Sequence, residues 1–142
     1  MQKHFEMALS IAIKAHEGQK DKAGAPYLLH VLRVMMSVEK MDEKTVALLH
    51  DVVEDSETTI GELTKAGFPK KILKAVELLT KTDKKPYEDY IQEIKNNDLA
   101  RAVKLADLKD NMNITRLKQV TVSDKLRIKK YKAAYNLLNS QS

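Results

Sequence analysis

The sequence predicts an all-α protein. Apolar residues recur at the spacing of a helix along almost the whole chain, and capping residues separate one periodic stretch from the next. Glycine and proline are scarce, at 4 and 3 of 142 residues, which disfavours an all-β fold. The valine-rich run 46–53 is the one plausible strand, and its length and flanks fit a helix better.

Periodicity defines the first three expected helices. Apolar side chains recur every three or four positions over residues 2–16, and Gly18 ends this helix. A polar loop over 18–26 separates it from a second helix at about 27–40. The third helix is expected over roughly 43–53.

Capping residues and prolines mark the next three helices. Thr59-x-x-Glu62 is a capping box for a short fourth helix, which Gly67 closes. Pro69 is expected to begin the fifth helix and Pro86 the sixth, because proline suits the first turn of a helix.

Two further helices complete the chain. Asp98 is expected to be the N-cap of a seventh helix over 99–112. Ser123 or Asp124 is expected to cap the C-terminal helix, at about 123–139.

Length and composition indicate a single domain over residues 1–142. The chain has no cysteine, which excludes a disulfide, a thiolate metal site and a cysteine nucleophile. Any metal ligands are therefore His, Asp or Glu, which suit harder or borderline divalent ions. No signal peptide and no run of about 20 apolar residues is present, so we expect a cytoplasmic protein without a membrane partner.

The net charge of +5 is concentrated in two segments, residues 65–85 and 116–132. Such a positive field attracts phosphorylated partners, either a nucleotide or a nucleic acid, although it also serves simply to keep a surface soluble. Aromatic residues make up 5% of the chain and offer little surface for stacking on single-stranded bases. A nucleic-acid partner is therefore the less favoured of the two.

The dipeptide His50-Asp51 lies in an apolar run and is followed by Glu54 and Asp55. Ionised carboxylates are seldom buried unless they are paired or bound to a metal. On a helix these side chains share one face, because Glu54 lies one turn from the dipeptide and Asp55 one turn from Asp51. One histidine and one carboxylate could then bind a metal while the next turn supplies an acid or base. The alternative is a solvated face with one hydrogen-bonded core histidine.

Other polar residues interrupt apolar stretches. His30 lies near the start of an apolar helix, and Asp107 interrupts a second one with Lys104 and Asn111 on the same face. A core histidine and a buried ion pair between Asp107 and Lys104 are the alternatives to a metal site. Lys22 belongs to a basic loop that could grip a phosphorylated or purine ligand, or simply lie in solvent.

The order His30, then His50-Asp51, then Asp107 resembles the HD superfamily of metal-dependent phosphohydrolases. The surrounding loops narrow the resemblance to the hydrolase domain of RelA/SpoT-type alarmone enzymes, over about residues 4–116. An HD dipeptide alone is a weak signal, whereas four motifs in the right order are a strong one. The motifs are Ala15-His16-Glu17-Gly18-Gln19-Lys20, Gly24-x-Pro26-Tyr27-x-x-His30, Leu48-Leu49-His50-Asp51-x-x-Glu54-Asp55 with Thr58, and Lys104-Leu105-Ala106-Asp107 with Asn111-Met112.

The resemblance implies a bundle-like helical fold around one divalent ion, typically Mn²⁺. Glu54 and Asp55 match the family's catalytic acidic pair, which activates or orients the attacking water. Carried over by position, the metal ligands are His30, His50, Asp51 and Asp107.

The resemblance also implies a nucleotide site. Lys22 matches a basic residue that packs near a guanine base. Tyr27 and Asn111 fall in segments that line the nucleotide pocket, with Asn111 near the ribose, and Lys104 lies towards the phosphates. The family reaction removes the 3′-pyrophosphate of (p)ppGpp and gives GDP or GTP and pyrophosphate.

This chain departs from the family pattern at several positions. Val31 stands where the family has a proline after the first metal histidine, and Lys109 and Asp110 replace an apolar residue and a histidine. Ile114 occupies a position where Thr or Ser is common. These changes spare the predicted ligands and alter a segment expected to line the nucleotide pocket, so the chemistry is better supported than the substrate.

Other functions therefore stay open. The same site could act on another phosphorylated nucleotide, including NADPH, or the chain could be a non-catalytic nucleotide sensor or a basic nucleic-acid-binding protein. All six predicted metal and catalytic residues are present, which argues against a sensor. The chain is too short for a synthetase or regulatory domain, so a stand-alone small hydrolase is expected, and a homo-oligomer is left open.

Overall fold

The fold is all-α, as the sequence predicts. The structure is a computed structural model that describes residues 2–140, and no strand occurs within that range. No helix among these residues has the length and apolar character needed to cross a membrane. The helices are α1 (Gln2–Ala15), α2 (Leu28–Ser37), α3 (Met41–Leu49), α4 (Val52–Asp55), α5 (Ile60–Ala66), α6 (Lys70–Leu79), α7 (Tyr87–Lys95), α8 (Asp98–Asn111) and α9 (Val122–Asn139).

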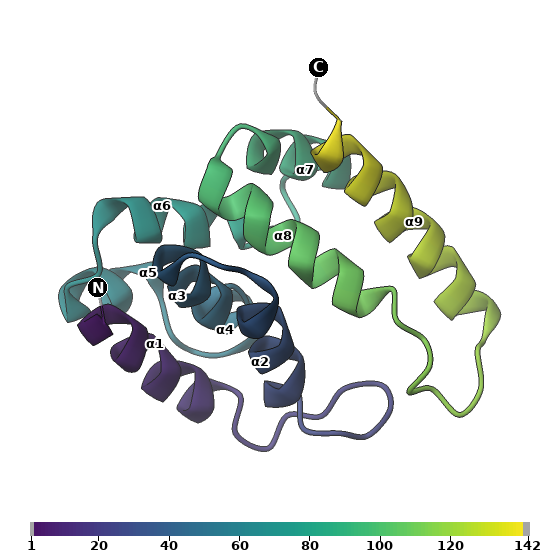
Figure 1. Ribbon diagram of the computed structural model, residues 1–142, viewed down its shortest axis with the longest axis horizontal. Helices are drawn as coiled ribbons and strands as arrows, with labels where there is room; N and C mark the ends of the chain where they lie inside the picture. The colour runs from purple at the N-terminus through teal and green to yellow at the C-terminus, as the bar shows by residue number, and fades with distance from the viewer. Residues whose placement is uncertain (1, 141–142) are drawn as a thin grey trace.

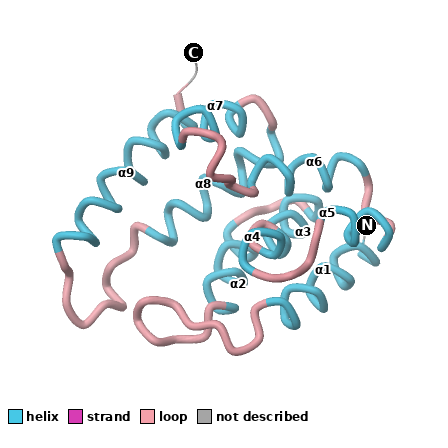
Figure 2. The backbone as a smooth tube through the Cα atoms, turned by 180° about the vertical axis from the view of Figure 1, so that it is seen from behind, coloured by secondary structure: helices cyan, strands magenta, loops and turns pink. Residues whose placement is uncertain are grey.

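Helix α3 lies at the centre of the molecule. It packs against α1, α2, α6 and α8, which surround it (Figure 1). Helix α8 in turn contacts α2, α6 and α7, and α9 covers the outer side of α7 and α8. Seen from behind, the α1–α2 and α8–α9 loops lie at the same edge of the molecule (Figure 2).

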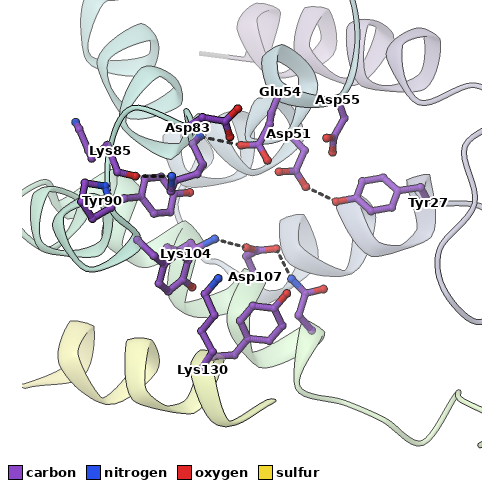
Figure 3. A pocket seen from close by; sticks show the side chains of 15 residues that line it. Tyr27, Asp51, Glu54, Asp55, Asp83, Lys85, Tyr90, Lys104, Asp107 and Lys130 are labelled. Carbon is purple, nitrogen blue, oxygen red and sulfur yellow. Dashed lines mark hydrogen bonds and ion pairs between the residues drawn. The ribbon is translucent and has the colours of Figure 1, made fainter. Parts of the chain in front are cut away.

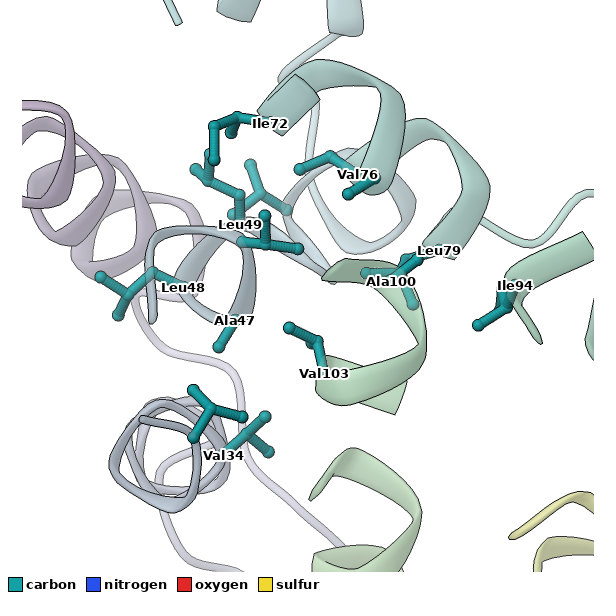
Figure 4. Packing of buried hydrophobic residues seen from close by; sticks show 14 of the residues in the cluster. Val34, Ala47, Leu48, Leu49, Ile72, Val76, Leu79, Ile94, Ala100 and Val103 are labelled. Carbon is teal, nitrogen blue, oxygen red and sulfur yellow. The ribbon is translucent and has the colours of Figure 1, made fainter. Parts of the chain in front are cut away.

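The core forms where α3 meets α6 and α8. Leu48 and Leu49 of α3 are fully buried in one cluster with Ile72 and Val76 of α6 and Val103 of α8 (Figure 4). Each such side chain contributes about 1.5–3 kcal/mol by leaving water. This packing holds the C-terminal end of α3 firmly, and the His50-Asp51 dipeptide follows directly.

The expected continuous helix over 43–53 is wrong at its C-terminal end. Helix α3 ends at Leu49, and Asp51 has φ −110° and ψ 1°, outside the helical region, before α4 begins. The Ala47 carbonyl accepts from the His50 amide at 3.4 Å and lies 2.6 Å from His50 Nδ1. In an uninterrupted helix that carbonyl would accept from the amide of residue 51. The histidine therefore ends the helix and turns the dipeptide inward.

Two predicted N-caps are also corrected. Asn97 rather than Asp98 caps α8, because the Asn97 side chain accepts from the Ala100 amide. Thr121 rather than Ser123 or Asp124 caps α9, where Asp124 instead completes a capping box. In both cases a neighbouring polar residue takes the cap and the predicted one falls in the first turn.

The signals for α5 are confirmed. Thr59 accepts from the Glu62 amide, and the Glu62 side chain accepts from the Thr59 amide, which is the predicted capping box. Gly67 ends the helix at φ 98°, a left-handed conformation that glycine adopts without steric cost.

Candidate active site

Four predicted ligands from three separate segments converge at the centre of the fold. His30 comes from the first turn of α2, His50 and Asp51 from the junction of α3 with α4, and Asp107 from α8. Each offers one ligand atom, and these atoms all lie within 4.8 Å of one another. The two histidines and Asp107 are at most 4% exposed, so the cluster is closed to water on most sides.

The geometry of His50 fits a cation at this point. Its Nε2 lies 3.0 Å from Asp51 Oδ2 and 3.3 Å from Asp107 Oδ1, yet this buried atom has no hydrogen-bond partner among the described residues. A buried polar atom without a partner calls for an explanation such as an ion. Nitrogen and oxygen donors that converge in this way suit a divalent metal.

Without a metal, the histidines and carboxylates of the ligand cluster stabilise one another's charged forms. Burial alone lowers the pKa of each histidine, but the neighbouring carboxylates prevail and raise the pKa of His30 and, more strongly, of His50. Burial alone raises the pKa of Asp107, but Lys104 and the histidines bring it well below its usual range. The metal-free site is therefore stabilised as imidazolium paired with carboxylate.

We expect the metal-free protein to lose stability as the pH rises. A histidine whose pKa is raised by folding stabilises the folded state fully below its unfolded pKa of about 6.5, and this contribution disappears as the pH passes the folded pKa. Melting temperatures measured in a chelator should thus fall between about pH 6 and pH 9. A divalent ion should weaken this trend, because it binds neutral imidazole. A melting temperature that rises or stays level over this range in chelator would contradict the assignment.

The acidic pair, Glu54 and Asp55, borders a cavity that lies over Asp51 and Asp107 of the ligand cluster. Glu54 and Asp55 extend from α4 beside Asp51, and Figure 3 shows all three carboxylates on one side of the cavity. Glu54 Oε1 accepts from the Lys81 amide at 2.8 Å, which ties α4 to the loop before α7. Partial burial and then the charge of Asp51 raise the pKa of Asp55, and partial burial raises that of Glu54.

Three predicted substrate residues contact the ligand cluster directly. The Tyr27 hydroxyl donates to Asp51, and Asn111 Nδ2 donates to Asp107 Oδ1 at 3.2 Å. Lys104 Nζ lies 3.0 Å from Asp107 Oδ2, so the ion pair considered as an alternative is present. These side chains line the cavity and orient the carboxylates at the same time.

Two cavities meet beside the cluster. The first, of about 560 Å³, lies over Asp51 and Asp107, and the second, of about 410 Å³, lies between the α1–α2 and α8–α9 loops. They share Tyr27, Asn111 and Tyr131. An elongated ligand could thus extend from the cluster into the second cavity.

Several lining residues of the first cavity were not predicted individually. They are Lys81, Asp83, Lys85, Pro86, Tyr87, Tyr90, Lys130 and Tyr131. Lys130 Nζ stacks 4.0 Å from the centre of the Tyr87 ring. The three lysines belong to the two basic segments seen in the sequence, so charge clustering was the signal that pointed to them.

The second cavity holds the predicted base-binding residue. Lys22 lines it and lies 3.6 Å from Asp124 of α9, with its side chain 61% exposed. Ile114 lines it too, which supports the expectation that the altered segment changes this pocket. Asp110, by contrast, lines neither cavity and instead faces His30.

His16, to which the sequence analysis assigned no role, lies at the edge of the site. It is 2% exposed, and its ring centre lies 5.2 Å from that of Tyr27. His16 Nδ1 lies 2.8 Å from Gln19 Oε1, and Gln19 Nε2 donates to the Asp55 carbonyl at 2.8 Å. These contacts hold the end of α4 against the α1–α2 loop, and their sequence signal is the first of the quoted motifs.

Comparison with known proteins agrees with this geometry. The family model described as "HD domain" matches residues 8–133. The chain belongs to the HD domain family. Within that family it is similar to guanosine-3′,5′-bis(diphosphate) 3′-pyrophosphohydrolase of Aquifex aeolicus, with 39% identity over 88 residues. It is also similar to the bifunctional (p)ppGpp synthase/hydrolase SpoT of Escherichia coli strain K12, with 36% identity over 91 residues.

These relatives are much longer proteins. The two alignments cover 59% and 61% of this chain but 12% and 13% of the relatives. A solved structure of a metazoan ortholog of SpoT, described as hydrolysing ppGpp, has the same fold, with a TM-score of 0.76 and 23% identity. That match covers 96% of this chain and 86% of the other. The HD family fold is thus shared over nearly the full length of the chain.

Proposed function

We propose that this protein is a metal-dependent phosphohydrolase of a phosphorylated nucleotide, with removal of the 3′-pyrophosphate of (p)ppGpp as the first candidate reaction. The observation that carries the proposal is the convergence of His30, His50, Asp51 and Asp107 next to an acidic pair in a lysine-lined cavity. The named activities of the Aquifex aeolicus and Escherichia coli relatives support this choice of substrate.

The four converging side chains would hold the metal, and we propose Mn²⁺. When bound, a divalent ion makes water more acidic and neutralises charge that develops on the phosphoryl group. Because the proposed ligands come from three segments, metal binding should also tie the fold together.

The remaining chemistry is assigned to the protein's own side chains. Glu54 and Asp55 activate or orient the attacking water, and one of the two carboxylates accepts its proton. Their raised pKa values bring them closer to neutrality, where a general base works best. Lys104 and the other cavity lysines compensate the negative charge of the phosphates. Tyr27 keeps Asp51 in place through its hydroxyl.

The nucleoside end would occupy the second cavity. Lys22 is proposed to pack near the base, and Asn111, which both cavities share, near the ribose. Ile114 in this cavity favours testing nucleotides other than ppGpp as well, including NADPH. We further propose that residues 1–142 act as one domain and that the protein functions in the cytoplasm.

The decisive experiment is product analysis after incubation of Mn²⁺-loaded protein with ppGpp, beside an Asp51→Ala control. Release of GDP and pyrophosphate by the wild type alone is the expected result. Metal binding without turnover would move the search to a nucleotide panel that includes NADPH, and no turnover of any member would leave a nucleotide sensor. Absence of both metal binding and turnover would overturn the proposal.

The nucleic-acid alternative has its own test. Binding of DNA or RNA that weakens steeply with added salt would revive it, because such binding depends on contacts with phosphates. We expect no such binding, since the lysines of the first cavity lie next to the carboxylates of Glu54 and Asp55, which offset their positive charge.

A further inference from the structure

Asp110 is a position where the chain departs from the family pattern. Its carboxylate contacts His30 of the ligand cluster, at the ring nitrogen that faces away from the other three ligands. Asp110 lies on the last turn of α8, three residues after Asp107, and its side chain is 13% exposed. Asp110 Oδ2 lies 2.6 Å from His30 Nδ1, while His30 Nε2 lies 2.9 Å from Asp107 Oδ1. Both ring nitrogens of His30 thus face carboxylates of the same helix.

Arg33 holds the Asp110 carboxylate in this position. Its Nε donates to Oδ1 at 2.8 Å and its Nη2 to Oδ2 at 3.0 Å, a two-point contact that fixes the plane of the carboxylate. Arg116 adds a second positive charge, with Nη2 at 3.7 Å from Asp110 Oδ2. Burial alone raises the pKa of Asp110, but the hydrogen bond to His30 and the Arg33 guanidinium bring it below its usual range.

The arrangement follows from helical spacing. Arg33 comes three residues after His30, so both side chains leave α2 on one face and a single carboxylate of α8 reaches both. Each aspartate beside His30 has its own cation, Lys104 for Asp107 and Arg33 for Asp110. The contact with Asp110 is therefore compensated in charge, which a buried carboxylate requires.

We propose that Asp110, held by Arg33, is a positioning residue for the metal centre: it accepts a hydrogen bond from Nδ1–H of His30 and so directs the Nε2 lone pair toward the ion. The proposal rests on the proposed function, in which His30 is a ligand. A carboxylate behind a ligating histidine fixes both the tautomer and the orientation of the ring, and its loss commonly costs 10–100-fold in metal affinity.

The test is Mn²⁺ affinity, measured by calorimetric titration of the full chain well below its melting temperature. Asp110→Asn keeps an acceptor but loses the charge, and we expect roughly 10-fold weaker binding; Asp110→Ala loses both, and we expect roughly 100-fold weaker binding. The nearly isosteric asparagine variant preserves the test if the alanine variant does not fold.

Asp124→Asn is the matched control. Asp124 is buried and, like Asp110, paired with an arginine, here Arg127, but it lies on α9 and outside the ligand cluster. We expect this substitution to lower the melting temperature and leave the Mn²⁺ affinity unchanged. If Asp110 had a purely structural role, its substitution would likewise lower the melting temperature and leave the Mn²⁺ affinity unchanged. A positioning role instead predicts a weaker Mn²⁺ affinity.

A second readout follows the histidine itself. In the Zn²⁺-loaded wild type, nitrogen NMR of the imidazole should show His30 protonated at Nδ1, and this signal should change in Asp110→Ala. Equal Mn²⁺ affinity of the wild type and both Asp110 variants would overturn the inference alone. A wild type that binds no metal would overturn it together with the proposed function, whereas weaker binding by the Asp110 variants supports it whichever nucleotide is cleaved.

Discussion

Asp51→Ala is expected to abolish both retention of a divalent metal and phosphohydrolase activity. Asp51 supplies one of the four converging ligand atoms and lies 3.0 Å from His50 Nε2, so its loss leaves an incomplete set of ligand atoms around the metal. His50→Ala should have the same effect. Metal content after desalting and the release of pyrophosphate from ppGpp measure the two losses.

The same variant should lose the thermal response to metal. Binding at a hundredfold excess over Kd stabilises a protein by about 2.7 kcal/mol, which corresponds to a rise of roughly 5–15 °C in the melting temperature of a domain of this size. We expect this rise with Mn²⁺ for the wild type and none for Asp51→Ala. Asp98→Ala is the matched control, because Asp98 lies on the ligand-bearing helix α8 with its side chain 97% exposed. A metal-induced rise retained in Asp51→Ala would exclude it as a ligand.

Glu54→Gln should slow the reaction and leave the metal in place. A positioned acid or base contributes roughly 10²–10⁴-fold to a rate, and glutamine has no ionisable group to replace it. Glutamine can still accept from the Lys81 amide, which the Glu54 side chain does at 2.8 Å, so the link between α4 and the following loop survives. Single-turnover rates with ppGpp, together with Mn²⁺ affinity, separate the two effects.

Glu57→Gln is the control for this prediction. Glu57 follows α4 by two residues, is exposed and lies outside the first cavity, so the same chemical change should leave the rate unaltered. Loss of metal from Glu54→Gln would show that Glu54 acts as a ligand. An unchanged rate with metal bound would remove Glu54 from the catalytic assignment.

The local features of the chain were predictable from its residues. The capping box at Thr59 and the left-handed Gly67 depend on residues next to each other in sequence, and both are confirmed. The break after Leu49 could not be read in this way, because it depends on the His50 side chain reaching the Ala47 carbonyl while the packed core holds α3. Helical periodicity depends only on the spacing of apolar residues, so it cannot predict a side chain that takes the place of a backbone hydrogen bond.

The sequence indicated the proposed metal ligands, but it did not indicate all of the residues that line the cavity beside them. The resemblance to the HD superfamily implied His30, His50, Asp51 and Asp107 as ligands, and the structure brings these four side chains together. Lys130 of α9 was seen only as part of a basic segment, since nothing in the sequence indicates that α9 packs along α7 and α8 and lines the same cavity.

Asp110 is a second residue whose contacts could not be predicted from the sequence. As a sequence change it was interpreted as an alteration of the nucleotide pocket, but the crossing of α2 and α8 places it against His30 and Arg33. The sequence by itself predicted most of the helices, because they follow from short-range spacing and capping residues, and the order of the motifs implied the proposed metal ligands through the family resemblance. Only the tertiary structure decided which side chains converge within 4.8 Å, which lysines line the first cavity and which carboxylate contacts His30 Nδ1, because these depend on how helices distant in the chain pack together.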